Sequence, residues 1–234
     1  MMATLRILSA GAAQAVVEPL IAAFKQEGHD ITAEFGAVGA MKTRLLEGTR
    51  ADMIILTAAL IDELIAAGQV VAGSRSDLGR VGTGVAVRTG SPLPDVTTIE
   101  VLRANLLAAT RIVCPDPATA TAGKIVMQAL ERMQIAEQSK PKLQLFPNGY
   151  AAMKWLAASR GRLEVGITQN TEIKANPGVA YVGPLPDALQ MKTVYSAGLC
   201  TGAQESELAR TFLARLTGPA NRPALAAAGY EFDN

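Results

Sequence analysis

Short runs of β-forming residues alternate with alanine-rich helical runs along most of this chain, and this alternation limits the fold more than any other feature. Within the first 68 residues a strand followed by a helix occurs three times. The strands are expected at residues 5–9, 31–35 and 53–56, and the helices at residues 14–26, 40–47 and 58–67. Such alternation is typical of α/β folds with mostly parallel strands. We therefore predict mixed sheets with helices on both faces.

Two long β runs, at residues 79–88 and 194–200, flank a second series of alternating strands and helices. Gly82 and Gly84 lie inside the first run and suit a bend between domains. Strands are expected at 111–114, 143–146 and 165–168, and helices at 122–133, 150–159, 205–216 and 219–228. We predict two lobes, residues 1–82 with 195–234 and residues 83–194. The two β runs would form a hinge of crossing segments, and a ligand cleft would lie between the lobes.

The composition excludes several classes of function. The chain has 22 Lys and Arg residues against 21 Asp and Glu, a net charge of +1, and only 4% aromatic residues, so no nucleic-acid partner is expected. Two cysteines and one histidine are too few for a four-ligand zinc site, and we predict neither a metal nor a cofactor. Cys114 and Cys200 each end a buried strand and are interpreted as packed thiols. His29 lies in a turn and is interpreted as part of a solvated connector.

Four predicted strand-to-helix turns are rich in small residues. They are Ser9–Ala13, Gly36–Ala40, Thr119–Gly123 and Asn148–Gly149. Small side chains let a ligand approach the backbone, and the free N–H groups at a helix start attract anions. The predicted ligand contacts are Ser9, Ala10, Gly11, Ala12, Ala37, Val38, Gly39, Ala40, Lys42, Thr57, Thr121, Ala122, Asn148, Gly149 and Gln169.

Several of these segments together resemble a known family. They are Leu5–Ala13, Phe35–Ala40 leading to Leu45–Gly48, Ala51–Ile55, Asp116–Gly123 and Val165–Ile167. The resemblance is to the periplasmic molybdate-binding proteins, the substrate-binding components of ABC importers. It implies the two-lobed type II periplasmic-binding-protein fold, a small anionic ligand, an ABC permease as partner and a monomeric state. It also implies a periplasmic location if a signal peptide has been removed, whereas a sequence complete as given would be cytoplasmic.

The positions expected to contact molybdate differ from the family pattern. In that family a serine in each of the first two turns and a late tyrosine contact the oxyanion. This sequence has Ala12 or Ala13 and Val38 or Gly39 in the two turns, and Gln169 in place of the tyrosine. Each lost hydroxyl contact to a charged ligand is worth about 1.5–3 kcal/mol. We therefore expect an oxyanion or polycarboxylate other than molybdate.

The sequence also resembles the bacterial aconitate isomerases, which share this scaffold and interconvert cis- and trans-aconitate by a cofactor-free allylic proton shift. A larger pocket poor in hydroxyl groups would suit a polycarboxylate. If the chain is such an enzyme, the candidate acid–base residues are Asp116, Tyr150 and Tyr195. From the sequence, binding and catalysis both remain open, with binding favoured because this fold is mostly found in binding proteins.

Overall fold

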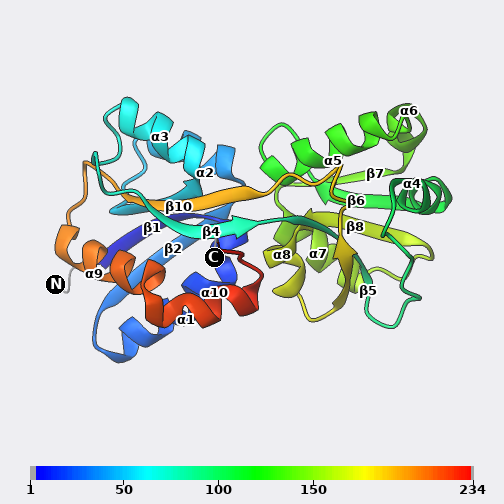
Figure 1. Cartoon of the computed structure of the whole chain (residues 1–234). Coiled ribbons are helices and arrows are strands. Elements are labelled where there is room, and N and C mark those ends of the chain that lie inside the picture. Colours follow the sequence, from blue (N-terminus) through cyan, green and yellow to red (C-terminus); the bar gives the residue numbers. More distant parts are fainter. Residues whose placement is uncertain (1–3, 233–234) are drawn as a thin grey trace. The chain divides into compact units, whose positions relative to one another are not determined.

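The computed structural model describes residues 4–232, which divide into two compact units (Figure 1). Unit 1 combines the chain up to Val81 with the chain from Thr193 onward, and unit 2 is Gly82–Lys192. The boundaries expected from the sequence lie within two residues of this division. Each unit is a sheet with helices packed on it.

The sheet of unit 1 has three parallel strands followed by two antiparallel ones. Its strands are β1 (Thr4–Ala10), β2 (Asp30–Gly36), β3 (Met53–Thr57), β4 (Ser76–Val81) and β10 (Thr193–Leu199). Their order is β2-β1-β3-β10-β4, with β1 parallel to β2 and β3, and β10 antiparallel to β3 and β4. All five residues of the central strand β3 are buried. Each fully buried aliphatic side chain in it contributes roughly 1.5–3 kcal/mol of hydrophobic stabilisation.

Helices cover the sheet of unit 1. They are the 3-10 turn η1 (Gly11–Ala13), α1 (Gln14–Gln26), α2 (Val38–Leu46), α3 (Ala58–Ala66), α9 (Ser206–Thr217), the 3-10 turn η3 (Pro219–Asn221) and α10 (Arg222–Ala228). Phe24 of α1 and Phe212 of α9 are both completely buried, with ring centroids 5.1 Å apart. The helices that begin and end the chain therefore share one core.

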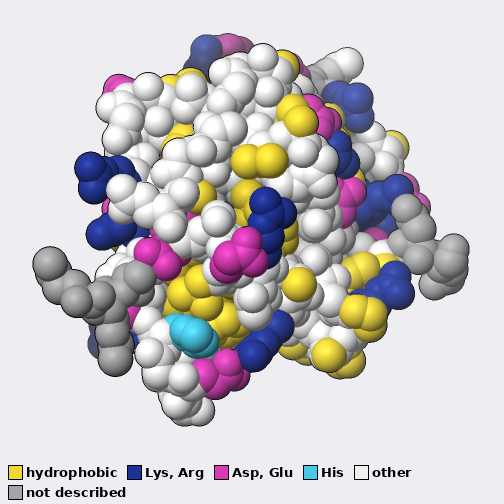
Figure 2. Space-filling model, turned by 90° about the vertical axis from the view of Figure 1, so that its left-hand side faces the viewer, with side chains coloured by type: hydrophobic (Ala, Val, Ile, Leu, Met, Phe, Trp, Pro, Cys, Tyr) yellow, Lys and Arg dark blue, Asp and Glu magenta, His cyan; other side chains and the backbone are white. Residues whose placement is uncertain are grey.

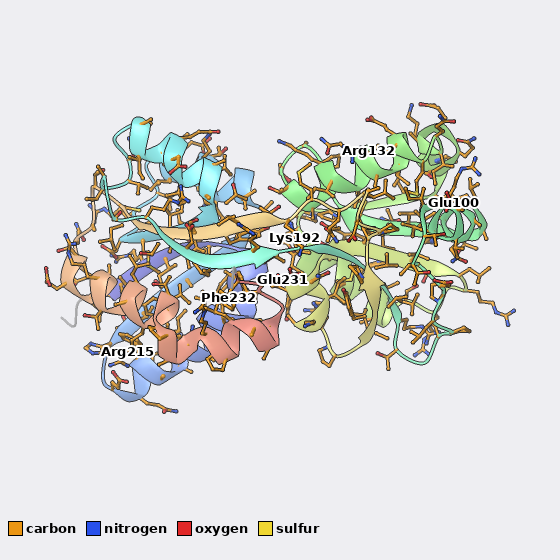
Figure 3. The ribbon with its side chains drawn as sticks, in the orientation of Figure 1. Glu100, Arg132, Lys192, Arg215, Glu231 and Phe232 are labelled. Carbon is orange, nitrogen blue, oxygen red and sulfur yellow. The ribbon has the colours of Figure 1, made fainter. Side chains whose placement is uncertain are left out.

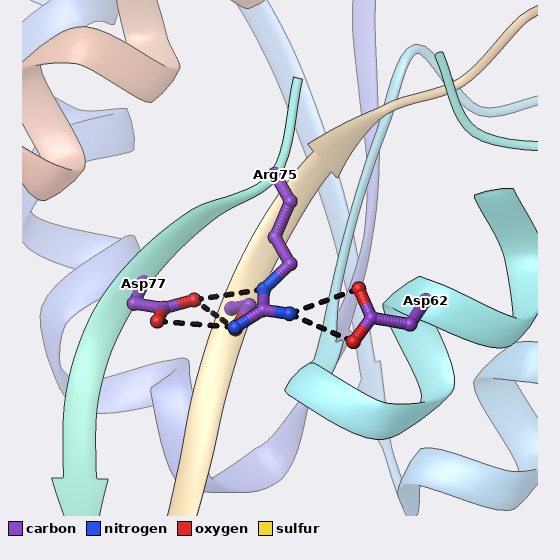
Figure 4. A network of polar contacts seen from close by, with 4 residues as sticks. Asp62, Arg75 and Asp77 are labelled. Carbon is purple, nitrogen blue, oxygen red and sulfur yellow. Dashed lines mark hydrogen bonds and ion pairs between the residues drawn. The ribbon is translucent and has the colours of Figure 1, made fainter. Parts of the chain in front are cut away.

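Polar contacts hold the edge strand β4 in unit 1. Arg75 donates to Asp62 of α3 at 2.7 Å and to Asp77 of β4 at 3.0 Å (Figure 4). Ser196 of β10 also donates to Asp77, at 2.6 Å. The C-terminal segment pairs with β4 from the other side, because Glu231 and Arg80 exchange backbone hydrogen bonds of 2.8 Å. Figure 3 shows Glu231 and Phe232 in this segment.

Unit 2 repeats the strand order of unit 1. Its strands are β5 (Thr83–Arg88), β6 (Arg111–Pro115), β7 (Leu143–Phe146), β8 (Glu164–Gln169) and β9 (Val179–Pro184). The order is β7-β6-β8-β5-β9, with β6 parallel to β7 and β8, and β5 antiparallel to β8 and β9. Its helices are α4 (Ile99–Ala108), α5 (Thr121–Arg132), α6 (Ala136–Ser139), the 3-10 turn η2 (Lys140–Lys142), α7 (Gly149–Ala158) and α8 (Asn170–Lys174). In both units, therefore, three parallel strands end at one edge of the sheet.

The β run expected at residues 79–88 is two strands, β4 and β5, which belong to different sheets and are separated by Gly82. Gly82, one of the two glycines expected to suit a bend, lies where the chain passes from one sheet to the other, and neither Gly82 nor Gly84 has a positive φ. A Cβ on Gly84 would lie 2.4 Å from Oδ1 of Asn170 and 2.6 Å from the ring of Tyr181, so glycine is needed there for close packing.

Five elements of unit 2 were not expected from the sequence: α4, α6, η2, α8 and β9. Within residues 4–232, no helix has the length and apolar character of a membrane span.

Candidate functional site

The small-residue turns of unit 1 lie at one edge of its sheet. Ala10 pairs with Gly36, and Ser9 pairs with Ile55, so the three parallel strands end side by side. Ser9 is completely buried, and its hydroxyl donates to the carbonyl of Ala10 at 3.1 Å. This edge gathers the predicted contacts Ser9, Ala10, Gly11, Ala12, Ala37, Val38, Gly39, Ala40 and Thr57.

The helices at this edge begin without side-chain caps. The N-cap residues of η1, α2 and α3 are Ala10, Ala37 and Thr57, and none of them makes a side-chain capping bond. The first N–H groups of a helix have no partner within the helix, so these starts present uncapped donors. Lys42, in α2, forms an ion pair with Glu63 of α3, and its side chain is 28% exposed. This pairing offsets the positive charge that Lys42 was expected to offer a ligand.

The turns of unit 2 also meet at one edge. Pro115 pairs with Phe146 at the ends of β6 and β7, and Gln169 at the end of β8 pairs with Thr83 of β5. The predicted contacts Thr121 and Ala122 begin α5, where Ala120 is an N-cap without a side-chain bond. Asn148 instead caps α7, because its Oδ1 accepts from the N–H of Ala151 at 2.8 Å.

A buried carboxylate occupies the start of α7. Glu172 of α8 accepts a 2.6 Å hydrogen bond from the hydroxyl of Thr168 and further bonds from the backbone N–H groups of Gln169, Tyr150 and Gly149. Burial raises the pKa of Glu172 above its ordinary value, although these four donors act in the opposite direction. The N–H of Gly149, expected to face a ligand, thus binds a carboxylate of the chain itself. The sequence analysis missed Glu172, although a glutamate following a buried strand was a signal for it.

Four residues at the start of β5, the end of β8 and the start of α8 carry buried polar atoms without a hydrogen-bond partner. They are the hydroxyls of Thr83 and Thr171, the Oδ1 of Asn170 and both polar atoms of the Gln169 amide. The exposed fraction is 0% for Thr83, 1% for Gln169 and Thr171, and 8% for Asn170. Buried polar groups are nearly always paired, so an unpaired one is explained by a ligand, an ion, a water or local strain. Arg88, at the far end of β5, and Ser139 of α6 each carry one such atom as well. Only Gln169 was predicted. The polar run from Gln169 to Glu172 directly after an apolar strand could have indicated the rest.

Gln169 and Thr83 face α5. Val165 and Ile167 of β8 and Val85 of β5 belong to the same apolar cluster as Ile125 of α5. Side chains alternate between the faces of a strand, so Gln169 and its pairing partner Thr83 project to that same face. The uncapped start of α5 lies above this face.

Two of the three candidate acid–base residues lie in unit 2. Asp116 follows β6, and its N–H donates to the carbonyl of Phe146 at 2.7 Å, while its Oδ1 accepts from the N–H of Ala118 at 2.8 Å. Tyr150 is half-buried in the first turn of α7. Tyr195 belongs to unit 1, where it is buried opposite Thr57 and packs edge-on against Tyr230 at 6.5 Å. The structure therefore brings Asp116 and Tyr150 to one edge, and Tyr195 to the corresponding edge of the other unit.

The histidine and the cysteines lie away from these edges. His29 precedes β2, at the opposite end of that strand from the turn, and is exposed beside a groove of about 450 Å³ lined also by Glu205 and Thr211 (Figure 2). Cys114 and Cys200 are buried free thiols, and burial raises the pKa of each to about 12. Within residues 4–232 no cluster of three or more His, Cys, Asp or Glu side chains could hold a metal ion.

Two α/β units of one topology, each ending three parallel strands at small-residue turns, define the type II periplasmic-binding-protein class. The chain belongs to the family of bacterial extracellular solute-binding proteins, whose sequence model matches residues 5–231.

Similar proteins support both resemblances. Aconitate isomerase from Pseudomonas sp. is 29% identical over 218 residues, which are 90% of this chain and 80% of that protein. The periplasmic molybdate-binding protein of Azotobacter vinelandii has a TM-score of 0.80 at 20% identity, with 98% of this chain and 100% of that chain covered. The sulfate-binding protein SubI of Mycobacterium tuberculosis has a TM-score of 0.72 at 16% identity, with 97% and 86% covered. These likenesses confirm the fold.

Proposed function

We propose that this chain binds a small anion, an oxyanion or polycarboxylate other than molybdate, and delivers it to an ABC permease. The observation that carries the proposal is the set of buried, unpartnered polar atoms around Gln169. A buried polar group without a partner costs about 1–3 kcal/mol. A bound ligand that forms hydrogen bonds with these atoms would remove this cost, and the free energy recovered would contribute to binding.

The groups around Gln169 favour a ligand that both accepts and donates hydrogen bonds. The amide nitrogen of Gln169 and the N–H groups at the start of α5 are donors, which suits a carboxylate. The amide oxygen of Gln169 is an acceptor, whereas the Oδ1 of Asn170 lies against Gly84. A ligand with a hydroxyl group, or a water bound beside the ligand, would satisfy the amide oxygen of Gln169. That the turns of unit 1 contact the same ligand stays a prediction.

Thermal-shift measurements with molybdate, tungstate, sulfate, cis-aconitate and trans-aconitate test the proposal. A ligand at 100 times its Kd stabilises the folded protein by about 2.7 kcal/mol. For a chain of this size that raises Tm by roughly 5–10 °C. If none of these anions raises Tm, the proposal is wrong.

The variant Gln169→Leu makes the test specific. Its leucine removes two unsatisfied polar atoms, so Tm without ligand should stay the same or rise, while the ligand-induced shift should disappear. Gln128→Leu, on the exposed side of α5, is the matched control and should leave the shift intact.

A second candidate function is isomerisation of aconitate. It is favoured by the 29% identity to aconitate isomerase over 90% of this chain. In this proposal the turns hold the carboxylates, and Asp116, Tyr150 or Tyr195 moves the proton between the allylic carbons. No cofactor is needed for such a shift.

Incubation with cis-aconitate separates the two functions. An isomerase forms trans-aconitate at a rate proportional to the protein concentration, whereas a binding protein releases its ligand unchanged. Tyr150→Phe, Tyr195→Phe and Asp116→Asn should each lower kcat more than they weaken binding if the replaced residue moves the proton, because a proton shuttle acts chiefly in the transition state. Tight binding without turnover would refute the enzymatic reading.

A further inference from the structure

The side chain of Glu172 is placed as a bound anion would be. Its carboxylate receives the Thr168 hydroxyl and three backbone N–H groups, from Gly149 and Tyr150 at the start of α7 and from Gln169 at the end of β8. Two segments that are distant in the sequence therefore share one acceptor group. One segment carries Tyr150, a candidate acid–base residue, and the other carries Gln169, a proposed ligand contact.

The Glu172 carboxylate and the Thr168 hydroxyl lie directly against the backbone of Gly149. A Cβ on Gly149 would lie 1.9 Å from Oε2 of Glu172 and 2.0 Å from Oγ1 of Thr168. Glycine is thus required at the first position of α7 so that the carboxylate can reach its N–H groups. Three of the four partners are backbone N–H groups, which can only donate, whereas the Thr168 hydroxyl can donate or accept.

We propose that Glu172 is a positioning residue, a buried hydrogen-bond acceptor that fixes the start of α7 and the end of β8 in the conformation that binds ligand. Through these bonds it sets the backbone of Gln169, whose amide is offered to the ligand, and of Tyr150. This proposal rests on the proposed function of the same edge. It also explains why the Asn148–Gly149 turn resembles an anion site: the acceptor it binds is part of the chain.

The variant Glu172→Ala combined with acetate tests this role. The substitution removes the γ-carbon and the carboxylate, which are the atoms of an acetate ion, and leaves the four donors in place. In chloride, we expect the affinity of Glu172→Ala for cis-aconitate to fall about tenfold or more, a change of at least about 1.4 kcal/mol. Acetate at the same ionic strength should restore most of this loss and raise Tm of the variant, without either effect on the wild type.

Glu164→Ala is the matched control. Glu164 is a buried glutamate at the beginning of β8, the strand that ends at Gln169. It forms an ion pair with Arg111 at 3.4 Å and lies away from the turns. Acetate should restore nothing in this variant. If Glu172→Ala does not fold, Glu172→Gln replaces it, and we expect weaker ligand binding that acetate does not improve, since no cavity is left.

The backbone amide signals of Gly149, Tyr150 and Gln169 in NMR spectra provide a readout that needs no ligand. They should move together in Glu172→Ala and return with acetate. If acetate raises the Tm of Glu172→Ala but does not restore its affinity for cis-aconitate, Glu172 only stabilises the fold, and the proposal is wrong. Amide signals that do not respond to the substitution or to acetate would also overturn it. If the wild type binds none of the anions tested, the proposed function fails, while the amide signals still decide whether Glu172 orders the two turns.

Discussion

The substitution Gly149→Ala sets two physical effects against each other, and the structure decides which prevails. Alanine in place of glycine usually stabilises a helix by about 0.5–1 kcal/mol when the backbone conformation allows it, and Gly149 does not have a positive φ. The added Cβ, however, would lie 1.9 Å from the Glu172 carboxylate and 2.0 Å from the Thr168 hydroxyl. Both atoms are buried and hydrogen-bonded to each other, so neither can move without breaking bonds.

The size of the loss follows from the bonds that must break. Moving the carboxylate by an ångström or more would break the bonds from the N–H groups of Gly149 and Tyr150, each worth about 1.5–3 kcal/mol because the acceptor is charged. After subtraction of the gain in helix propensity, we expect a net loss of about 3 kcal/mol. A loss of this size lowers Tm by roughly 6–12 °C in a chain of this length.

Thermal unfolding followed by circular dichroism measures this loss. Gly202→Ala is the control, since its Cβ would meet nothing within 4 Å, and its stability should stay within about 0.5 kcal/mol of wild type. The double variant Gly149→Ala/Glu172→Ala should cost less than the sum of its single changes, because the main clash is then absent. A Gly149→Ala protein as stable as wild type would refute the reasoning.

Three further predictions concern buried or paired groups. Asp52→Asn should destabilise the protein by about 2–4 kcal/mol in urea unfolding, because its buried carboxylate accepts from three backbone N–H groups at 2.7–3.0 Å. Cys114 and Cys200, with pKa raised to about 12, should react with Ellman's reagent at pH 8 on the order of a thousandfold more slowly in the native protein than in denaturant. Burial alone would raise the pKa of Asp77, but hydrogen bonds from Arg75 and Ser196 bring it below its ordinary value. Asp77 therefore contributes stability above that ordinary pKa, near 4, which is lost as the pH falls; in Asp77→Asn, Tm measured from pH 6 to pH 3 should decline less steeply.

The sequence predicted most strands to within one residue at each end. The helix at Gln14–Gln26 and the strand at Leu143–Phe146 have the expected bounds. Such segments are recognised by local periodicity and by glycine at their ends. The helix α8 has five residues, too few for a helical period to show, and it carries the polar groups on which the site depends.

The site itself was predicted only in part, because its polar contacts join residues far apart in the sequence. The small residues in the turns could be recognised from the sequence, but the residues that contact those turns in the fold could not. Gly149 was interpreted as open to a ligand, whereas its N–H binds Glu172, which lies 23 positions further along the chain. Gly84 was interpreted as suiting a bend, and its close packing against Asn170 could not be read from the sequence. Glycine in a sequence indicates that something approaches the backbone closely, and only the fold shows what does.

The two units use one strand order but treat the starts of their helices differently. In unit 1, the N-cap residues of η1, α2 and α3 make no side-chain capping bond. In unit 2, Asn148 and Glu172 supply acceptors at the start of α7, while the start of α5 has no side-chain cap. Donors that already have an internal acceptor hold a turn rigid, and donors without one gain most from an external anion. We therefore expect ligand anions to bind at the uncapped starts, and the α7 turn to serve as the fixed support that presents Gln169 to them.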